Sequence, residues 1–316
     1  MDKTIERPEW TSSSSIYTTQ VEPRPVLEHI TIVIPTLGRP ILEECLVRII
    51  SGTCWPKALL VVHQGNEPYI RDLVKVVNEK GIEAVYIYSA ERGKPAATNR
   101  AFAQACTRFV CMVDDDCFVE SDWLQNMYLR LLQNPDWVIT GRVEPAGNET
   151  VAIVQSRDAS VQFRPRLKFD LFVGGNMGVA LDVVRRIGLF DEDPLLRNAA
   201  EDVEWGYRAL RKGIPIAYSP EVAVSHYGWR DGKEKSNRFK SYGYGHGAFY
   251  GKYLRWGDLF ILGRAIGHFG RALRRWVRGT VAGDAELAML GRAYCLNLLP
   301  GILAGIRSTI QPGELK

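Results

Sequence analysis

The sequence predicts an α/β protein with a mostly parallel sheet, helices on both faces and an amphipathic helical extension at the C-terminus. The prediction rests on short apolar or β-branched runs that alternate with segments of helical period. The expected strands are residues 30–34, 58–62, 84–88 and 109–113. The expected helices between and after them are residues 40–50, 68–79 and 95–107.

Later elements follow a weaker pattern. A helix is expected at 121–133, a strand at 138–143, and a helix near 202–212 that ends at a Gly before a Pro. Residues 144–172 have no clear period, so no element is predicted there. The expected organisation is a flexible N-terminal arm at 1–28, a main domain at 29–257 and a helical extension at 258–316.

Composition excludes several classes of protein. The 316 residues are 46% hydrophobic and 24% charged, unlike a disordered or fibrous chain. The six cysteines form no CxxC pair and the first residues are polar, which predicts reduced thiols and a cytoplasmic location. Residues 251–280 hold seven basic and one acidic side chain, so the net charge of +4 is concentrated in one block and no nucleic-acid partner is expected.

Three adjacent carboxylates, Asp114, Asp115 and Asp116, follow directly after the fourth predicted strand. Ligands of open parallel sheets bind outside the carboxyl ends of the strands. Neighbouring carboxylates raise one another's proton affinity unless a cation neutralises them. On an extended backbone Asp114 and Asp116 point the same way and could share Mg²⁺ or Mn²⁺. The alternative is a solvated acidic turn, and a calcium loop of the EF-hand type is disfavoured by Phe118.

Five motifs occur in one order along the chain. They are Ile32 to Thr36, Glu91-Arg92-Gly93 with Asn99-Arg100, Asp114 to Asp116, Gly174 to Met177, and Glu201 to Glu204. This order, over residues 29–250, resembles the family 2 glycosyltransferases of the GT-A fold. The resemblance implies a Rossmann-like sheet, a divalent cation (Mn²⁺ or Mg²⁺), and inverting transfer of a hexosyl or deoxyhexosyl group from a UDP-, dTDP- or GDP-sugar.

The resemblance also implies roles for single residues. Asp114 would touch the nucleotide ribose and, with Asp116, lie at the metal. His226 resembles a further metal ligand, and its alternative is a hydrogen-bonded structural histidine. Inversion needs one base for the acceptor hydroxyl, and the family pattern makes it Asp202, with Glu201 shaping the site. The alternative for Asp202 is a helix cap.

Donor contacts are implied at further positions. Pro35 and Thr36 would lie against the nucleotide base, Arg92 would reach phosphate or ribose oxygens, and Lys94 is either a similar contact or ordinary loop charge. The others are Asn99 in the following helix, Asp115, Gly175 and Asn176. Trp205 and Tyr207 either stack on a sugar or pack in the core. Gln64 stands where the family commonly has an acidic residue that reads the base. Its amide offers both a donor and an acceptor and could hydrogen-bond a pyrimidine edge, but the identity of the nucleotide stays open.

The C-terminal block contains an amphipathic segment, residues 259–278. Leu259, Leu262, Ile266, Phe269, Leu273 and Trp276 fall on one arc of a helix, and five arginines fall opposite them. Such a helix either lies on an anionic membrane surface or packs on the domain with a solvated basic face. The apolar residues 293–306 are too few to span a bilayer, although they could dip into it.

Residues 238–253 are aromatic, basic and rich in glycine. With Trp229, Arg230, Lys233 and Lys235 they are expected to form either a lid over a diphosphate or acceptor phosphate, or a packed loop.

The predicted function is therefore transfer of a sugar to a hydroxyl of a glycan or lipid-linked acceptor. The resemblance implies that the acceptor can be lipid-linked, which would explain why the enzyme is located at a membrane surface. Two alternatives remain. A nucleotidyltransferase shares the architecture, but its glycine-rich loop after the first strand is missing, since residues 35–39 contain one Gly. A non-catalytic scaffold would bind membranes through residues 259–278 and would not bind nucleotides.

Overall fold

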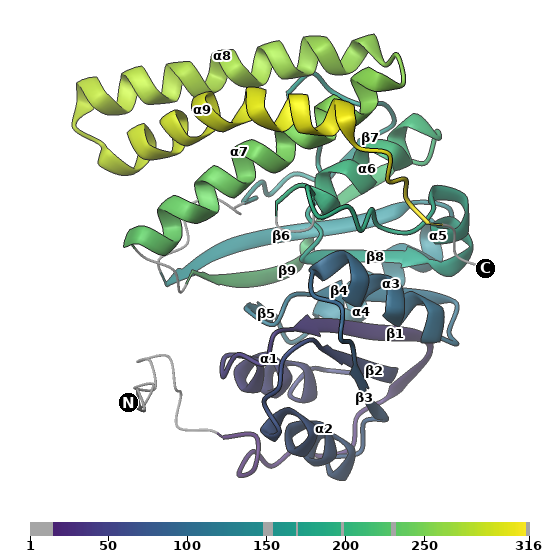
Figure 1. Ribbon diagram of the computed structural model, residues 1–316. Coiled ribbons are helices and arrows are strands. Elements are labelled where there is room, and N and C mark those ends of the chain that lie inside the picture. The colour runs from purple at the N-terminus through teal and green to yellow at the C-terminus, as the bar shows by residue number, and fades with distance from the viewer. Residues whose placement is uncertain (1–14, 148–153, 169, 197–198, 229–231, 314–316) are drawn as a thin grey trace.

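The computed structural model describes residues 15–147, 154–168, 170–196, 199–228 and 232–313 (Figure 1). Its first half is the predicted alternation of strands and helices. The strands are β1 (Val26–Thr36), β2 (Trp55–His63), β3 (Ala84–Tyr88) and β4 (Phe109–Val113). The helices are α1 (Leu42–Ile50), α2 (Tyr69–Glu79) and α3 (Lys94–Gln104). All three strand pairs in this half are parallel, which confirms the predicted fold class.

The second half of the sheet is mixed. Its elements are β5 (Cys117–Val119), α4 (Trp123–Gln133), β6 (Val138–Gly147), β7 (Ser160–Gln162), β8 (Asn176–Ala180), α5 (Leu181–Ile187), α6 (Glu201–Arg211) and β9 (Ile216–Gly228). The strand order is β3-β2-β1-β4-β8-β6-β9-β5, with β7 beside β9. Since β8 is antiparallel to both of its neighbours and β6 is parallel to β9, six of these strands run in one direction.

The central strands are buried along their length. All five residues of β4 are buried, as are the last seven of β1. Strands covered on both faces have continuous apolar runs in place of alternation. That is why β4 has the predicted bounds and why β1 and β2 contain the predicted cores. The edge strand β3 also has the predicted bounds, although Val85 and Tyr88 are exposed.

The N-terminal segment packs on the domain where it is described. Residues 1–14 of the predicted flexible arm lie outside the described residues. Ile16 is fully buried in the main core. The Ser15 hydroxyl and the Ile16 backbone N–H donate hydrogen bonds to Glu43 Oε1 on α1, at 2.7 and 3.0 Å. The first strand begins at Val26, within the segment predicted as an arm.

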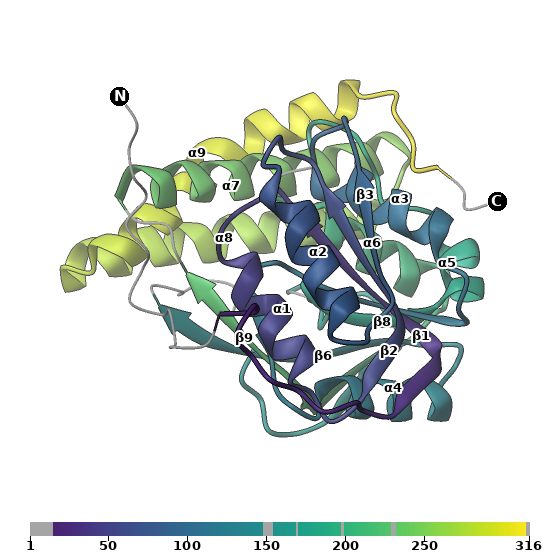
Figure 2. The ribbon, with the colours of Figure 1, turned by 90° about the horizontal axis from the view of Figure 1, so that it is seen from below.

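Three long helices end the chain: α7 (Gly232–Arg255), α8 (Leu259–Ala282) and α9 (Ala285–Arg307). They lie at the end of the molecule opposite α1 and α2 (Figures 1 and 2). The segment expected as a lid or a packed loop is α7, which is a regular helix and not a loop. Its aromatic residues Phe249 and Tyr250 are buried, as the packed alternative expected. Trp229 and Arg230 lie outside the described residues. The predicted boundary at 257 falls between α7 and α8.

Glycines explain why the loop-like composition of α7 forms a helix. A Cβ added at Gly247 or Gly251 would lie under 3.0 Å from backbone atoms of α9. The same holds in reverse for Gly301 and Gly305 of α9 against α7. Glycine normally weakens a helix, but here it lets two helix backbones touch. The contact between α7 and α9 therefore depends on tertiary packing, which the local sequence of α7 does not predict.

Candidate active site

A cavity of about 480 Å³ opens where the carboxyl ends of the parallel strands meet. Each of the first four strands contributes its following loop, with Thr36, Gln64, Arg92 and Asp114 among the lining residues. The second half adds Gly175, Glu201, Asp202 and His226, and the first turns of α7 add Lys235, Arg238, Phe239 and Tyr242. Residues from distant parts of the sequence thus surround one space.

The three carboxylates of the acidic cluster point to different partners. The backbone turns after β4, because the Cys117 N–H donates to the carbonyl of Asp114 at 3.0 Å. The extended backbone on which the shared metal position of Asp114 and Asp116 depended is therefore absent. Lys94 Nζ lies 2.6 Å from Asp114 Oδ1, while His226 Nε2 lies 3.4 Å from Asp116 Oδ1.

Arg39 holds the other two carboxylates and was missed by the sequence reasoning. Its guanidinium forms an ion pair with Asp115 and lies 3.0 Å from Asp116 Oδ2. Thr36 Oγ1 also donates to Asp115 Oδ2 at 2.6 Å. Burial alone would lower the pKa of Arg39, but Asp115 and Asp116 raise it. Arg39 could have been predicted from its position in the loop after β1, because β1 pairs with β4 and the acidic cluster follows β4.

Lys94 is a central cation of the site, so the expectation of ordinary loop charge is wrong. Its burial opposes the charge, but Asp114, Asp202 and Glu201 together raise its pKa. Burial also raises the pKa of Asp115, to about 6, against the pull of Arg39.

Gln64 holds the loop that carries Arg92 and Lys94. Its amide Nε2 donates to the Gly93 carbonyl at 2.9 Å, and its Oε1 accepts from the Gly93 N–H at 3.3 Å. Gly93 has φ +128°, a conformation that favours glycine. The side chain expected to read the nucleotide base therefore fixes the neighbouring loop.

Glu201 and Asp202 form the first turn of α6 and both line the cavity. Asp202 Oδ1 accepts from the Val203 N–H at 2.7 Å, and Oδ2 accepts from the Gly174 N–H at 3.3 Å. These two bonds orient the carboxylate at the N-terminus of the helix. Burial, with the Asp202 charge, raises the pKa of Glu201 to about 7. Of the two, Glu201 is therefore a carboxyl group that holds its proton more strongly than usual.

Two asparagines expected at the donor do not line the cavity. Asn99 pairs with Phe190, accepting from its N–H at 2.8 Å and donating to its carbonyl at 2.9 Å. Asn176 is fully buried; it accepts from Trp123 Nε1 and donates to the Val222 carbonyl, both at 2.9 Å. Their predicted donor contacts are therefore replaced by structural roles, because their amides are used to join separate elements.

Gly175 lines the cavity as expected, and the reason is close approach. A Cβ there would lie 2.6 Å from Asp114 Oδ2. Trp205 and Tyr207 are fully buried, so the predicted stacking on a sugar is wrong and core packing is right. Trp205 stacks on Phe190 with ring centroids 5.0 Å apart.

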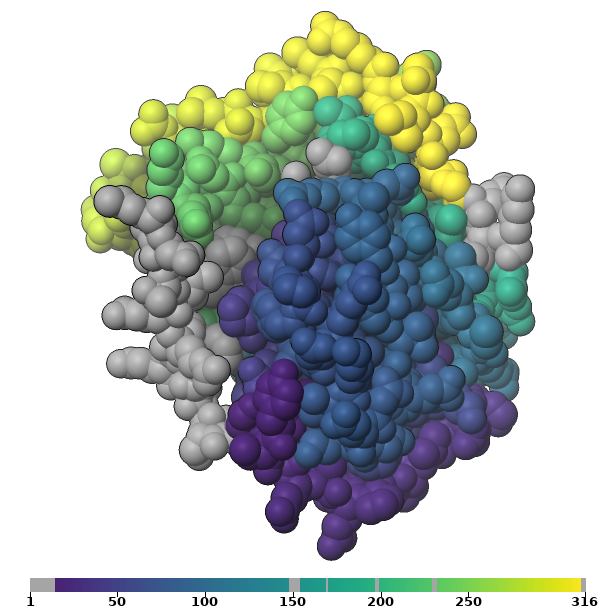
Figure 3. All heavy atoms as spheres, turned by 60° about the horizontal axis from the view of Figure 1, so that its bottom comes forward, coloured from purple at the N-terminus to yellow at the C-terminus, as the bar shows by residue number. Residues whose placement is uncertain are grey.

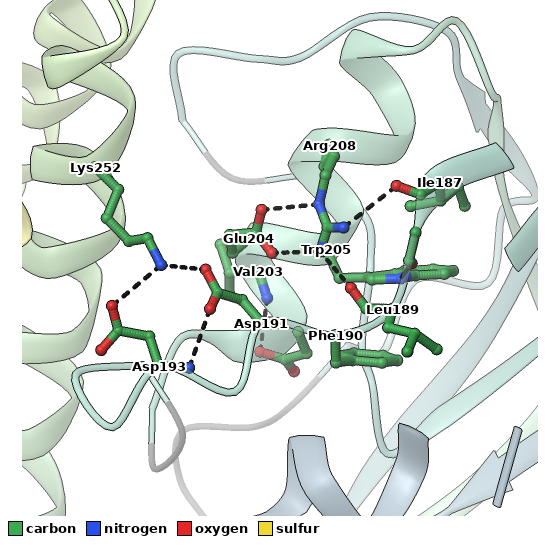
Figure 4. A network of polar contacts seen from close by, with 12 residues as sticks. Ile187, Leu189, Phe190, Asp191, Asp193, Val203, Glu204, Trp205, Arg208 and Lys252 are labelled. Atoms are coloured by element: carbon green, nitrogen blue, oxygen red, sulfur yellow. Dashed lines mark hydrogen bonds and ion pairs between the residues drawn. The ribbon is translucent and has the colours of Figure 1, made fainter. Parts of the chain in front are cut away.

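A buried polar network holds α6 in place (Figure 4). Lys252 of α7 forms ion pairs with Asp191 and, at 3.1 Å, with Asp193. On α6 itself, Arg208 pairs with Glu204 at 2.8 Å. The ion pairs of Lys252 fix the segment before α6 against α7, and so they help to position the helix turn that carries Glu201 and Asp202.

The ligand atoms of Asp116, Cys117 and His226 lie within 4.8 Å of one another, and Cys117 faces His226 across the β5–β9 pair. Burial, with the nearby carboxylates, raises the pKa of the Cys117 thiol well above its usual value. A protonated thiol is a poor ligand, whereas carboxylate and imidazole suit Mn²⁺ or, through oxygen, Mg²⁺. Asp116 and His226 therefore fit a divalent cation, and among the described residues Asp114 falls outside this group.

Known structures share this fold. A Pyrobaculum calidifontis mannosyltransferase, PcManGT, solved with GDP-Man and Mn²⁺, has a TM-score of 0.56 at 16% identity, covering 95% of this chain and 90% of that one. S. aureus TarS 1–349 has a TM-score of 0.56 at 13% identity, over 84% of this chain and 90% of that one. GalNAc-T7, solved with UDP, GalNAc and Mn²⁺, has a TM-score of 0.55 at 14% identity, over 72% and 51%.

The sheet with acidic residues at its carboxyl edge is that of a GT-A glycosyltransferase. Residues 31–189 match the model of glycosyl transferase family 2, and the chain belongs to that family. Among curated proteins, the glycosyltransferase GlyA of Streptococcus pneumoniae is 25% identical over 107 residues, which are 34% of this chain and only 15% of that protein. The family decides against the nucleotidyltransferase alternative.

Proposed function

We propose that the protein is an inverting glycosyltransferase that uses Asp202 as its base. The observation that supports this is the position of Asp202. Its carboxylate lies at the N-terminus of α6 and lines the same cavity as Lys94, Arg39 and the acidic cluster. A base and a set of cations around one cavity are what transfer from a nucleotide diphosphate sugar requires.

In the proposed reaction Asp202 takes the proton of an acceptor hydroxyl. The hydroxyl oxygen bonds to the anomeric carbon as the bond to the diphosphate oxygen breaks, so the sugar is inverted and a nucleoside diphosphate leaves. The backbone N–H groups of Val203 and Gly174 hold the Asp202 carboxylate in place before the proton arrives. Glu201, with its pKa near 7, shapes the site beside the base.

The donor is proposed to lie along the strand ends. Pro35 and Thr36 would contact the base, Asp114 the ribose, and Arg92 the phosphates, since all of them line the cavity. Asp116 and His226 would hold Mn²⁺ or Mg²⁺, which when bound offsets the charge of the diphosphate. The solved complexes of PcManGT with GDP-Man and of GalNAc-T7 with UDP, each with Mn²⁺, support a nucleotide sugar and a cation here.

The transferred group is proposed to be hexosyl or deoxyhexosyl, and the acceptor a hydroxyl of a glycan or a lipid-linked carrier, as in polysaccharide biosynthesis. The proposed location is the cytoplasmic face of an anionic membrane, with the enzyme peripherally bound through residues 259–278. The basic side chains of that segment support the location.

Thermal unfolding with UDP, dTDP or GDP, each with and without Mn²⁺ or Mg²⁺, tests the donor site. One nucleotide at 100 times its Kd should stabilise the fold by about 2.7 kcal/mol, with the cation required. No shift with any of the three, in buffer and with lipid vesicles, would contradict the donor site and favour the non-catalytic scaffold.

Asp202→Asn tests the base. It should keep the nucleotide shift and lose about 10²- to 10⁴-fold in transfer rate, whereas Asp122→Asn, at an exposed carboxylate on α4's N-terminal side, should keep both. Transfer by the Asp202→Asn protein at the wild-type rate would show that another group is the base.

A further inference from the structure

Helix α8 packs with its apolar arc facing outward. The described residues Leu259, Leu262, Ile266, Phe269 and Leu273 are between 43 and 76% exposed. The buried side instead holds Arg264 and His268, both fully buried, with small residues such as Ala265 and Ala272. The expected alternative, a helix packed through its apolar face with a solvated basic face, is therefore wrong.

The helix contacts beneath this arc are made by small residues. A Cβ at Gly279 of α8 or at Gly291 of α9 would lie under 3.0 Å from backbone of the other helix. Meanwhile α9 exposes a stripe of large apolar residues, Leu296, Leu299, Leu303 and Ile306. Small residues between helices and large apolar ones outside is the arrangement of helices packed in lipid, and the reverse of packing in water.

The composition of α9 agrees with this. It has 23 residues and is long and apolar enough to cross a membrane by length and composition alone. The apolar run of 293–306 expected from the sequence is thus the second part of a longer helix. In the space-filling view, the C-terminal residues in yellow form the edge of the molecule on the far side from the first strand (Figure 3).

A loop beside α8 adds basic and apolar side chains. Phe163 and Leu167 are 59 and 54% exposed, and Arg164, Arg166 and Lys168 are exposed as well. Leu167 reaches α8, where a Cβ at Gly263 would lie 3.4 Å from its Cδ2.

Arg264 explains how this loop is held. Its Nη1 donates to Asp170 Oδ2 at 2.5 Å, and Asp170 Oδ1 accepts from the Arg166 N–H at 3.1 Å and from Gln162 Nε2 at 2.5 Å. The buried arginine of α8 therefore fixes the loop at residues 163–168 beside the exposed apolar arc.

We propose that the exposed arc of α8, the exposed stripe of α9 and the loop at 163–168 form one lipid-binding face. It seats in the headgroup and outer acyl region of an anionic bilayer, with Leu and Phe side chains in the hydrocarbon and the basic side chains at the phosphates. This proposal deepens the membrane location proposed above. It depends on the proposed function only in so far as that function includes a lipid-linked acceptor.

Charge favours a bilayer over a second copy of the chain. Arg274 and Arg278 are exposed beside the arc of α8, and the loop contributes three more basic side chains. In a two-fold dimer the same patch contacts itself, so these cations would face each other. An anionic lipid surface neutralises them.

Vesicle flotation of the full chain tests the face, with phosphatidylglycerol-rich and pure phosphatidylcholine vesicles. The wild type should bind the anionic vesicles more tightly. Leu262→Glu with Ile266→Glu should lower the partition coefficient by on the order of 100-fold. The matched control is Leu129→Glu with Leu132→Glu, at apolar side chains of α4 that are 47 and 44% exposed, and it should bind like wild type.

The charge component has its own pair of variants. Arg164→Gln with Arg166→Gln should weaken binding to anionic vesicles roughly 30-fold, and Lys57→Gln with Lys75→Gln, at exposed lysines of the sheet half, should not. Equal binding by wild type and the double-Glu variant would overturn the proposal. The proposal would also be overturned if light scattering showed that the wild type is a dimer and the double-Glu variant a monomer, while neither protein bound vesicles.

Failure here is separable from failure of the proposed reaction. Flotation needs no donor and no turnover, so the Asp202→Asn protein should float with vesicles like wild type. The double-Glu variant should keep the nucleotide-dependent thermal shift in buffer, which also shows that it is folded.

Discussion

Replacing Lys252 by Met should destabilise the protein strongly. The side chain of Lys252 is 1% exposed and its ammonium group pairs with Asp191 and Asp193, whose side chains are 1 and 2% exposed. Methionine keeps most of the volume but removes the charge. Two carboxylates would then be buried without their cation, in the segment that leads to α6 (Figure 4).

The magnitude follows from this burial. Breaking a buried ion pair by removing one partner costs about 3 to 5 kcal/mol. Asp193 keeps its bonds from the Ser308 hydroxyl and, at 2.9 Å, from the Leu195 N–H, which places the expected loss near the lower value. Changing Asp191 and Asp193 to Asn as well should recover part of the loss, since the uncompensated charges disappear.

The assay is urea denaturation at pH 7, followed at pH values down to 4. Burial and Glu204 already raise the pKa of Asp191 against the opposing pull of Lys252, and losing Lys252 raises it further. A raised folded pKa means stability that is present at low pH and lost as the pH rises. The deficit of Lys252→Met should therefore widen from pH 4 to pH 7.

Lys240→Met on the same helix is the control. Lys240 is exposed, so the change should stay within about 0.5 kcal/mol. A Lys252→Met loss of under about 1 kcal/mol, or a triple variant no more stable than the single one, would refute the reasoning that this network anchors the segment before α6.

Further outcomes concern packing and charge. Gly247→Ala should lower the free energy of unfolding by about 1 to 3 kcal/mol in thermal unfolding, because the added Cβ would overlap the Leu298 carbonyl. Gly270→Ala should instead stabilise the protein by up to about 1 kcal/mol, because a Cβ there meets no described atom within 4 Å. Equal effects of the two changes would contradict the close helix contact. The folded pKa of Glu201 is raised to about 7, so its stabilising contribution is complete below pH 4.5 and is lost as the pH rises through 7. Glu201→Gln should therefore flatten the fall in stability between pH 4.5 and 8, measured by urea denaturation. An unchanged pH profile would contradict this prediction. Arg39→Gln should lower the free energy of unfolding by about 3 kcal/mol, because it leaves buried carboxylates of the acidic cluster without their cation; a loss below about 1 kcal/mol would show that other groups neutralise them.

The sequence could predict those parts of the fold whose cause is local. Strand β4 was predicted residue by residue, because a strand covered on both faces must be apolar throughout. The acidic cluster was placed at the carboxyl edge of the sheet for the same reason, since it follows such a strand. The edge strand β3 also matches its predicted bounds, although it is partly exposed. Helix α7 was not predicted, because its glycines are explained only by the backbone of α9 lying against them.

Side-chain partners within the site were the harder part. Thr36, Gly175, Asp202 and His226 line the cavity because strand ends and helix starts bring them there. Asn99 and Asn176 come from the same motifs, yet their amides turn into the core. A motif fixes where the backbone runs, and the hydrogen-bonding groups of neighbouring elements decide which way a side chain turns.

The sequence by itself determined the order of strands and helices in the first half of the chain, the acidic edge of the sheet and the amphipathic character of α8, because all three depend on spacing along the chain. Only the tertiary structure decided that Asp114 and Asp116 separate at a turn, that Arg39 neutralises two of the carboxylates, and that the apolar arc of α8 faces outward. The physical reason is common to all three. A periodic pattern states which side of a helix is apolar, but what covers that side depends on contacts between residues far apart in the sequence.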